Sequence, residues 1–181
     1  AHDWGDAASR PLLTLDDALD AFTRPPLGAV EFDLDIKVVG REAEIVAAIQ
    51  SRELTARAMV STMYTETLAA VGALEPELRL GWTYPLATRA YDRSRLMRPL
   101  VLAALKEMQA RFPAEARRRV PRIGASAIWL YHQLATPEIV AAARELDVEL
   151  ICWTVDDSAR VAELRRMGVD GIVSNDPRLL S

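Results

Sequence analysis

Short runs of β-forming residues alternate with segments of helical periodicity from about residue 29 to the end of this chain. The predicted strands span residues 29–36, 56–61, 78–82, 123–130, 149–155 and 171–174. The predicted helices span residues 14–22, 41–52, 65–74, 94–111, 136–146 and 158–167. Strands that alternate with helices run parallel, because each crossover helix returns the chain to the same edge of the sheet. The sequence therefore predicts an α/β fold, either a doubly wound sheet or an eightfold barrel.

Polar residues cluster at or just after the ends of all the predicted strands. They are Asp33, Asp35, Lys37, Ser61, Thr62, Thr83, Tyr131, His132, Thr154, Asp156, Asp157, Ser174, Asn175 and Asp176. A set spread over so many strand ends describes a ring of site residues, which favours a TIM-type (β/α) barrel over a sheet with one crevice. Only six of the eight strands are visible, so we expect an incomplete barrel that lacks two strands at its N-terminus. Residues 1–181 are expected to form one such domain.

The first predicted strand carries a row of charges. Alternation along a strand points Glu31, Asp33, Asp35 and Lys37 to one face and the apolar residues between them to the other. Buried charges carry a heavy desolvation cost unless they pair or hold a metal, so the row suggests a functional site. An edge strand whose charges simply face water explains the same pattern.

Composition excludes several classes of function. The chain is 50% hydrophobic and 27% charged, with a net charge of -4, which argues against a nucleic-acid surface. No apolar run approaches the ~20 residues that span a bilayer, and the single Cys152 excludes an internal disulfide. The sequence opens at Ala1-His2-Asp3 without an initiator Met, so we expect a longer natural N-terminus. The cytoplasmic location that we expect depends on what that segment contains.

Several motifs resemble those of one enzyme family. Residues 153–157 read W-T-V-D-D and residues 168–177 read G-V-D-G-I-V-S-N-D-P. These resemble the closing WTVN and GVDGIITDxP signatures of the glycerophosphodiester phosphodiesterases. Residues 33–37 resemble that family's N-I-E-I-K strand, with Asp33 at the Asn position and Asp35 at the Glu position. His2-Asp3 resembles its HD motif. The family's H-R-G and E-x-D strands have no counterpart before His2.

The resemblance implies a TIM-type barrel that hydrolyses glycerophosphodiesters to an alcohol and glycerol 3-phosphate with a divalent cation and two histidines. It makes Asp35 a ligand of Mg²⁺ or Ca²⁺, which prefer oxygen donors, and His2 the acid/base. Lys37 would neutralise the phosphate as a catalytic and substrate-binding residue. Trp153 would wall the glycerol moiety, with core packing as the competing interpretation. His132 could bind substrate or be a hydrogen-bonded structural residue.

The motifs that are absent limit the expectation for this chain alone. They supply one His and two metal carboxylates, so we expect the isolated chain to be inactive unless an N-terminal segment or a second chain completes the barrel. One alternative is a non-catalytic remnant or regulatory module that binds a phosphate ester. Another takes Lys37 as the Schiff-base lysine of an aldolase-type barrel. In each case the partner is a small molecule.

Overall fold

The computed structural model describes residues 13–85 and 98–180, with side chains from residue 100 onward in the second range. Six parallel strands form one sheet in the order β1-β2-β3-β4-β5-β6. They are β1 (Phe32–Asp35), β2 (Ala58–Thr62), β3 (Arg79–Tyr84), β4 (Ala127–Tyr131), β5 (Glu149–Trp153) and β6 (Gly171–Ile172). Every strand pairs with its neighbour in the sequence, which is the order of a barrel and not of a doubly wound sheet. The expected incomplete TIM-type barrel is confirmed.

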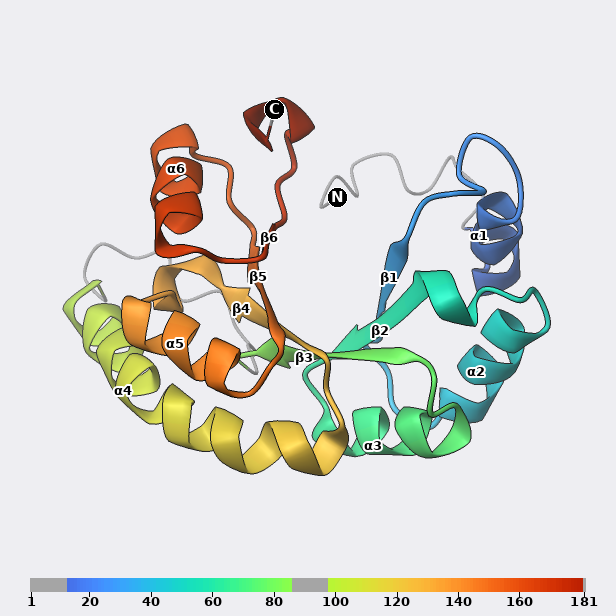
Figure 1. Cartoon of the computed structure of the whole chain (residues 1–181), viewed down its shortest axis with the longest axis horizontal. Coiled ribbons are helices and arrows are strands. Elements are labelled where there is room, and N and C mark those ends of the chain that lie inside the picture. The colour runs from blue at the N-terminus through green and yellow to red at the C-terminus, as the bar shows by residue number, and fades with distance from the viewer. Residues whose placement is uncertain (1–12, 86–97, 181) are drawn as a thin grey trace.

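The helices lie outside the curled sheet, as Figure 1 shows, with β1 and β6 at the two ends of the curl. They are α1 (Leu15–Phe22), α2 (Glu42–Gln50), α3 (Thr65–Leu74), α4 (Arg98–Ile123), α5 (Pro137–Glu145) and α6 (Ser158–Met167). Short 3-10 turns span Thr55–Arg57, His132–Leu134 and Pro177–Leu180. No helix in the described ranges is long and apolar enough to cross a membrane.

The core lies between the sheet and the helices. Alternate residues of the central strands point outward into it and are almost wholly buried: Val60, Leu80, Trp82, Ile128, Leu130, Leu150 and Cys152. Each large apolar side chain removed from water in this way contributes about 1.5–3 kcal/mol before entropy costs. The residues between them point to the inner side of the curl, where Asp33, Ser61 and Thr83 are collected. Thr62, predicted in the same ring, instead points outward in register with Trp82 and is buried in the core.

Side-chain caps fix where three helices begin. Thr14 Oγ1 accepts a hydrogen bond from the Asp17 backbone N–H at 3.1 Å, and the Asp17 carboxylate accepts one from the Thr14 N–H. This is a capping box with Asp in place of Glu. Thr136 caps α5 ahead of Pro137, and Asp157 caps α6 by accepting from the Arg160 N–H at 2.8 Å. Each such cap contributes about 0.5–2 kcal/mol.

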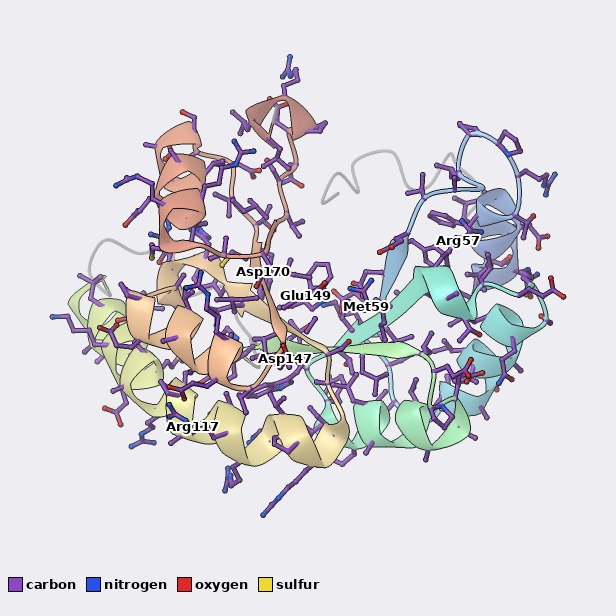
Figure 2. The ribbon with its side chains drawn as sticks, in the orientation of Figure 1. Arg57, Met59, Arg117, Asp147, Glu149 and Asp170 are labelled. Atoms are coloured by element: carbon purple, nitrogen blue, oxygen red, sulfur yellow. The ribbon has the colours of Figure 1, made fainter. Side chains whose placement is uncertain are left out.

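The segment that leads into β1 is held by one arginine. The Arg57 guanidinium donates hydrogen bonds to the carbonyls of Phe22, Leu27 and Val30, at 2.7, 3.2 and 3.0 Å. Figure 2 shows Arg57 beside α1. Because these acceptors flank the turn before β1, the contacts fix the point at which the charged strand enters the sheet.

The boundary between α4 and β4 differs from the prediction. A helix was expected over 94–111 and a strand over 123–130, but α4 runs to Ile123 and β4 begins at Ala127. Two prolines, Pro113 and Pro121, lie within α4, where each removes one helical hydrogen bond. The buried stripe Phe112, Ala116 and Val120 recurs every four residues and holds the helix against the core. The free energy gained when this stripe packs against the core therefore outweighs the loss of the helical hydrogen bonds at the two prolines.

Candidate functional site

A pocket of about 350 Å³ opens on the inner side of the curl at the carboxyl ends of the strands. All the strands contribute to it directly or through the residue that follows. Its lining consists of Asp33, Asp35, Lys37, Ser61, Thr83, Trp129, Trp153, Thr154 and Val173. In a barrel of parallel strands the carboxyl end is where active sites are built. The charges of the β1 row thus meet side chains from distant parts of the chain.

Asp33 is the most enclosed carboxylate of the pocket. Its Oδ2 accepts a hydrogen bond of 2.6 Å from the Ser61 hydroxyl of β2, while its Oδ1 is buried with no hydrogen-bond partner. Burial raises the pKa of Asp33 from its ordinary value of 3.8 to about 7. The Asp35 charge raises this pKa further, whereas the Ser61 hydrogen bond and Lys37 lower it. Without a cation, the pocket therefore holds an acid that titrates near neutrality.

Asp35 and Lys37 form an ion pair at the mouth of the pocket. The Lys37 Nζ lies 2.5 Å from Asp35 Oδ2, and the two side chains are 59% and 43% exposed. Asp35 ends β1, and Lys37 follows in the loop. Glu31, predicted on the same face, lies away from the pocket and pairs with Arg79 at 2.9 Å. β1 is an edge strand within the described sheet, but Asp33 and Asp35 both line the pocket.

Two indoles and Val173 form the apolar part of the lining. The Trp129 Nε1 lies 3.3 Å from the sulfur of Met59, an inward residue of β2 that Figure 2 labels. Trp129 can lie there because Gly81 has no Cβ, since a Cβ at that position would be 2.6 Å from Trp129 Nε1. The Trp153 Nε1 is buried without a hydrogen-bond partner. Trp153 lines the pocket, and its contact with the glycerol moiety stays a prediction.

His132 is the one histidine within the described residues, and it does not belong to this set. His2 lies outside the described residues. His132 opens the 3-10 turn after β4 and is not among the pocket-lining residues. Its ring contacts Tyr131, whose ring in turn contacts Trp153. Burial and the Arg160 guanidinium lower the pKa of His132, so the imidazole is neutral at physiological pH. Substrate binding by His132 stays a prediction.

Asp156 braces the pocket's rim without lining it. Its carboxylate accepts hydrogen bonds from the Ser174 hydroxyl and from the backbone and side-chain amides of Asn175, at 3.0, 2.8 and 2.8 Å. These bonds join the two closing sequence signatures and lower the pKa of Asp156. Asp156 therefore joins the two loops, whereas Asp157 caps α6.

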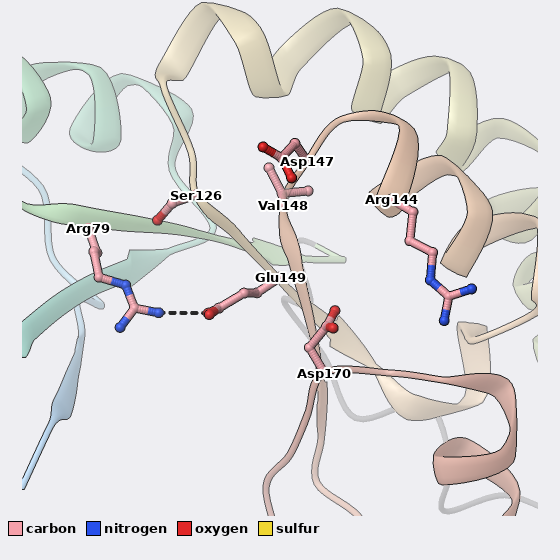
Figure 3. Close-up of a pocket in the computed structure, with 7 residues that line it drawn as sticks. All are labelled: Arg79, Ser126, Arg144, Asp147, Val148, Glu149 and Asp170. Atoms are coloured by element: carbon pink, nitrogen blue, oxygen red, sulfur yellow. Dashed lines mark hydrogen bonds and ion pairs between the residues drawn. The ribbon is translucent and has the colours of Figure 1, made fainter.

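A second pocket, of about 410 Å³, lies at the opposite end of the sheet, and Figure 3 shows its lining. Four of its five charged side chains already have partners. Arg79 pairs with Glu149 at 2.6 Å, and Asp170 accepts from the Leu150 N–H at 2.8 Å. Arg144 donates to the Gly168 carbonyl. The amino-terminal end of a parallel barrel contributes stability rather than chemistry, so the pocket of Asp33 is the candidate site.

Sequence reasoning missed part of this set. It placed Asp33, Ser61 and Thr83 in the ring of polar residues at the strand ends but assigned none of them a catalytic, metal-binding or substrate-binding role. Ser61 is the informative one, because a hydroxyl at the end of the strand next to β1 can reach a β1 carboxylate. The β1–β2 register, which pairs Asp33 with Met59 and Asp35 with Ser61, is needed to see it.

Fold and site define a (β/α) barrel protein with carboxylates, an ammonium group and indoles at the carboxyl ends of its strands. A family model described as the glycerophosphoryl diester phosphodiesterase family matches residues 23–179. The chain belongs to this family.

Individual relatives agree with that assignment. A glycerophosphodiester phosphodiesterase of Caldanaerobacter subterraneus subsp. tengcongensis is 24% identical over 141 residues, which cover 78% of this chain and 48% of that protein. The solved glycerophosphodiester phosphodiesterase of Agrobacterium tumefaciens superposes with a TM-score of 0.64 at 19% identity, over 93% of this chain and 60% of that one.

A second similar structure holds a ligand. It is a phosphodiesterase of Oleispira antarctica in complex with the product sn-glycerol-3-phosphate, with a TM-score of 0.61 at 17% identity. The match covers 89% of this chain and 56% of that one. At these identities the solved structures show the fold alone, and the chain spans about half the length of the relatives that it matches.

Proposed function

We propose that the protein containing this chain hydrolyses glycerophosphodiesters to an alcohol and glycerol 3-phosphate with the help of a divalent cation. The observation that carries the proposal is the meeting of Asp33, Asp35 and Lys37 in one pocket at the carboxyl ends of the strands. Family membership supports the reaction class, and the Oleispira relative binds the corresponding product.

The donor atoms of the pocket suit a hard cation. Carboxylate oxygens are the ligands that Mg²⁺ and Ca²⁺ prefer, and the buried Asp33 Oδ1 has no hydrogen-bond partner among the described residues. Among the described residues no group of three or more His, Cys, Asp or Glu forms a metal cluster. Mg²⁺ often takes only one or two carboxylates and completes its shell with water and phosphate. Asp35 would hold the cation, which when bound draws charge from the phosphoryl oxygens.

The Lys37 ammonium group has a role separate from that of the metal ion. A phosphodiester carries a negative charge that repels nucleophiles, and the Lys37 ammonium lies at the pocket mouth where it can neutralise that charge. The proposal assigns Lys37 to binding and stabilising the phosphate. Trp153 would pack against the glycerol moiety, and His2 would move the proton at the bridging oxygen.

Other segments would complete the site. Within the described sheet, β1 and β6 each pair with a single strand, and the relatives are about twice as long as the aligned region. We propose that an N-terminal segment, or a second chain, supplies the remaining strands and ligands. The test is the release of glycerol 3-phosphate from glycerophosphocholine by the full-length protein, with Mg²⁺ or Ca²⁺ and with EDTA.

One observation favours a second function. The described pocket offers only two carboxylates, which suits a module that binds a phosphate ester without hydrolysing it. Binding of glycerol 3-phosphate without metal-dependent turnover by the full-length protein would select this alternative. The interpretation of Lys37 as a Schiff-base lysine is disfavoured. That chemistry needs a desolvated neutral amine, whereas Lys37 is exposed and paired with Asp35.

A further inference from the structure

The two oxygens of the Asp33 carboxylate have different surroundings. Oδ2 is fixed by the buried Ser61 hydroxyl at 2.6 Å. Oδ1 is buried and accepts no hydrogen bond. Burying an anionic oxygen without a partner costs several times more free energy than burying a paired one. Native proteins therefore rarely contain such an atom outside functional sites. Asp33 therefore has one oriented oxygen and one free oxygen.

Among the described residues no cation pairs with Asp33, and Lys37 compensates its charge only in part. In the part of the molecule that the structure describes, no Lys, Arg or His nitrogen forms an ion pair with Asp33, and the nearby Lys37 ammonium is engaged by Asp35 instead. Ser61 is a neutral donor and offsets only part of the desolvation cost. At pH values above its pKa of about 7, the ionised Asp33 would be stabilised by a small positive ligand at Oδ1.

The geometry of β1 places Asp33 beside the proposed cation. Residues two apart on a strand point to the same face, and Asp33 and Asp35 both line the same pocket. Asp35 is also one methylene shorter than the Glu of the N-I-E-I-K motif, while Asp33 stands where that motif has a neutral Asn. A shorter ligand holds an ion nearer to the strand and thus nearer to Asp33.

We propose that Asp33 is a second carboxylate ligand of the divalent cation that Asp35 holds, with Oδ1 as the donor atom and Ser61 as the residue that orients it. The inference rests on the proposed function, because it presumes a cation in this pocket. It goes beyond that function in giving the site a ligand that the motif does not supply.

The experiment is calcium binding by isothermal titration calorimetry on the full-length protein, without substrate. Asp33→Asn keeps the shape of the side chain and removes its charge. It should weaken Ca²⁺ binding by about tenfold or more, the loss expected on removing even an outer-shell partner. Ser61→Ala should weaken binding by less. Thermal melts in EDTA establish that the variants are folded.

Glu31→Gln is the matched control. Glu31 lies two residues before Asp33 and carries the same charge, but it is 69% exposed, pairs with Arg79 and does not line the pocket. Its removal should change Ca²⁺ affinity by less than about twofold, as for a screened surface charge. An equal loss of Ca²⁺ affinity in both variants would mean that Asp33 acts only through its long-range electrostatic field. That result would overturn the proposal.

Asp35→Asn separates this proposal from the proposed function. If Asp35→Asn abolishes binding and Asp33→Asn leaves it unchanged, the cation site stands and Asp33 is only a hydrogen-bonded structural acid. If the wild type binds Ca²⁺ and neither variant alters the affinity, the cation lies elsewhere, and both the inference and the assigned site are wrong.

Discussion

At the scale of single residues, Asp33 links the site to the stability of the fold. Its side chain is enclosed by its own strand and by β2, and burial is the main reason that its pKa is raised to about 7. A carboxyl group with a raised folded-state pKa binds its proton more tightly in the native than in the unfolded chain. Its contribution to stability is therefore complete at acid pH and is lost as the pH rises toward and through 7.

This predicts a pH-dependent effect of Asp33→Asn. With cations removed by EDTA, the wild type should lose stability between pH 5 and pH 8 relative to Asp33→Asn, because only the wild type must ionise a buried acid. Melting curves at the two pH values measure this, and each kcal/mol corresponds to about 2–4 °C. The same difference between the two proteins at both pH values would contradict the assigned titration.

Gly81 makes room for Trp129 in the lining of the pocket. A Cβ there would lie 2.6 Å from Trp129 Nε1 and 3.1 Å from the Ser61 Cβ. Gly81→Ala should therefore cost about 1–3 kcal/mol through overpacking, and it should displace Trp129, which its fluorescence would report. Gly28→Ala is the control, since the added Cβ makes only ordinary contacts of 3.4 Å or more. Similar melting temperatures for the two variants would refute the close-approach argument.

At the scale of elements, local sequence predicted which segments are strands and helices, because each carries its own periodicity. The boundary of α4 could not be predicted locally. Pro113 and Pro121 signal the end of a helix, and only contact with the core explains why α4 continues past both. Likewise Asp35, Lys37 and Trp153 were predicted from motifs, whereas the Asp33–Ser61 contact depends on the register between two strands.

The packing of α4 can be tested at Phe112. Its fully buried ring stacks on Trp82 with centroids 5.8 Å apart and meets Tyr84 edge-on at 4.9 Å. Phe112→Ala should cost about 3–5 kcal/mol, measured by chemical denaturation. Leu102→Ala in the same helix, where the side chain is 51% exposed, should change stability by less than about 0.5 kcal/mol. A small effect at Phe112 would mean that α4 is not held by this stripe.

At the scale of the whole molecule, the site belongs to no single element. Its lining comes from strands β1 to β5 and from the loops that follow β1, β5 and β6. Asp156 adds a brace between the loops that follow β5 and β6. Since β1 and β6 each have one neighbour among the described strands, the distance between Asp35 at one end of the curl and Val173 at the other depends on what completes the barrel.

We therefore predict that residues 1–181 alone hydrolyse glycerophosphocholine at no measurable rate and bind Mg²⁺ or Ca²⁺ weakly. The physical reason is that exposed strand edges and an incomplete ligand set leave the site unsupported. Intact-mass spectrometry would verify the length of the sample that is assayed. Robust metal-dependent turnover by a monomer of this length would show that the described residues form a sufficient site.

The central claim is that Asp35 holds a cation needed for phosphodiester hydrolysis, and Asp35→Ala in the full-length protein tests it most directly. The measurement is glycerol 3-phosphate release from glycerophosphocholine with Mg²⁺ or Ca²⁺. The substitution removes an exposed carboxylate whose ion pair with Lys37 adds at most about 1 kcal/mol, so the fold should be retained. We expect metal-dependent activity to be abolished with the melting temperature nearly unchanged. Full activity in Asp35→Ala, with unaltered metal affinity, would contradict the account.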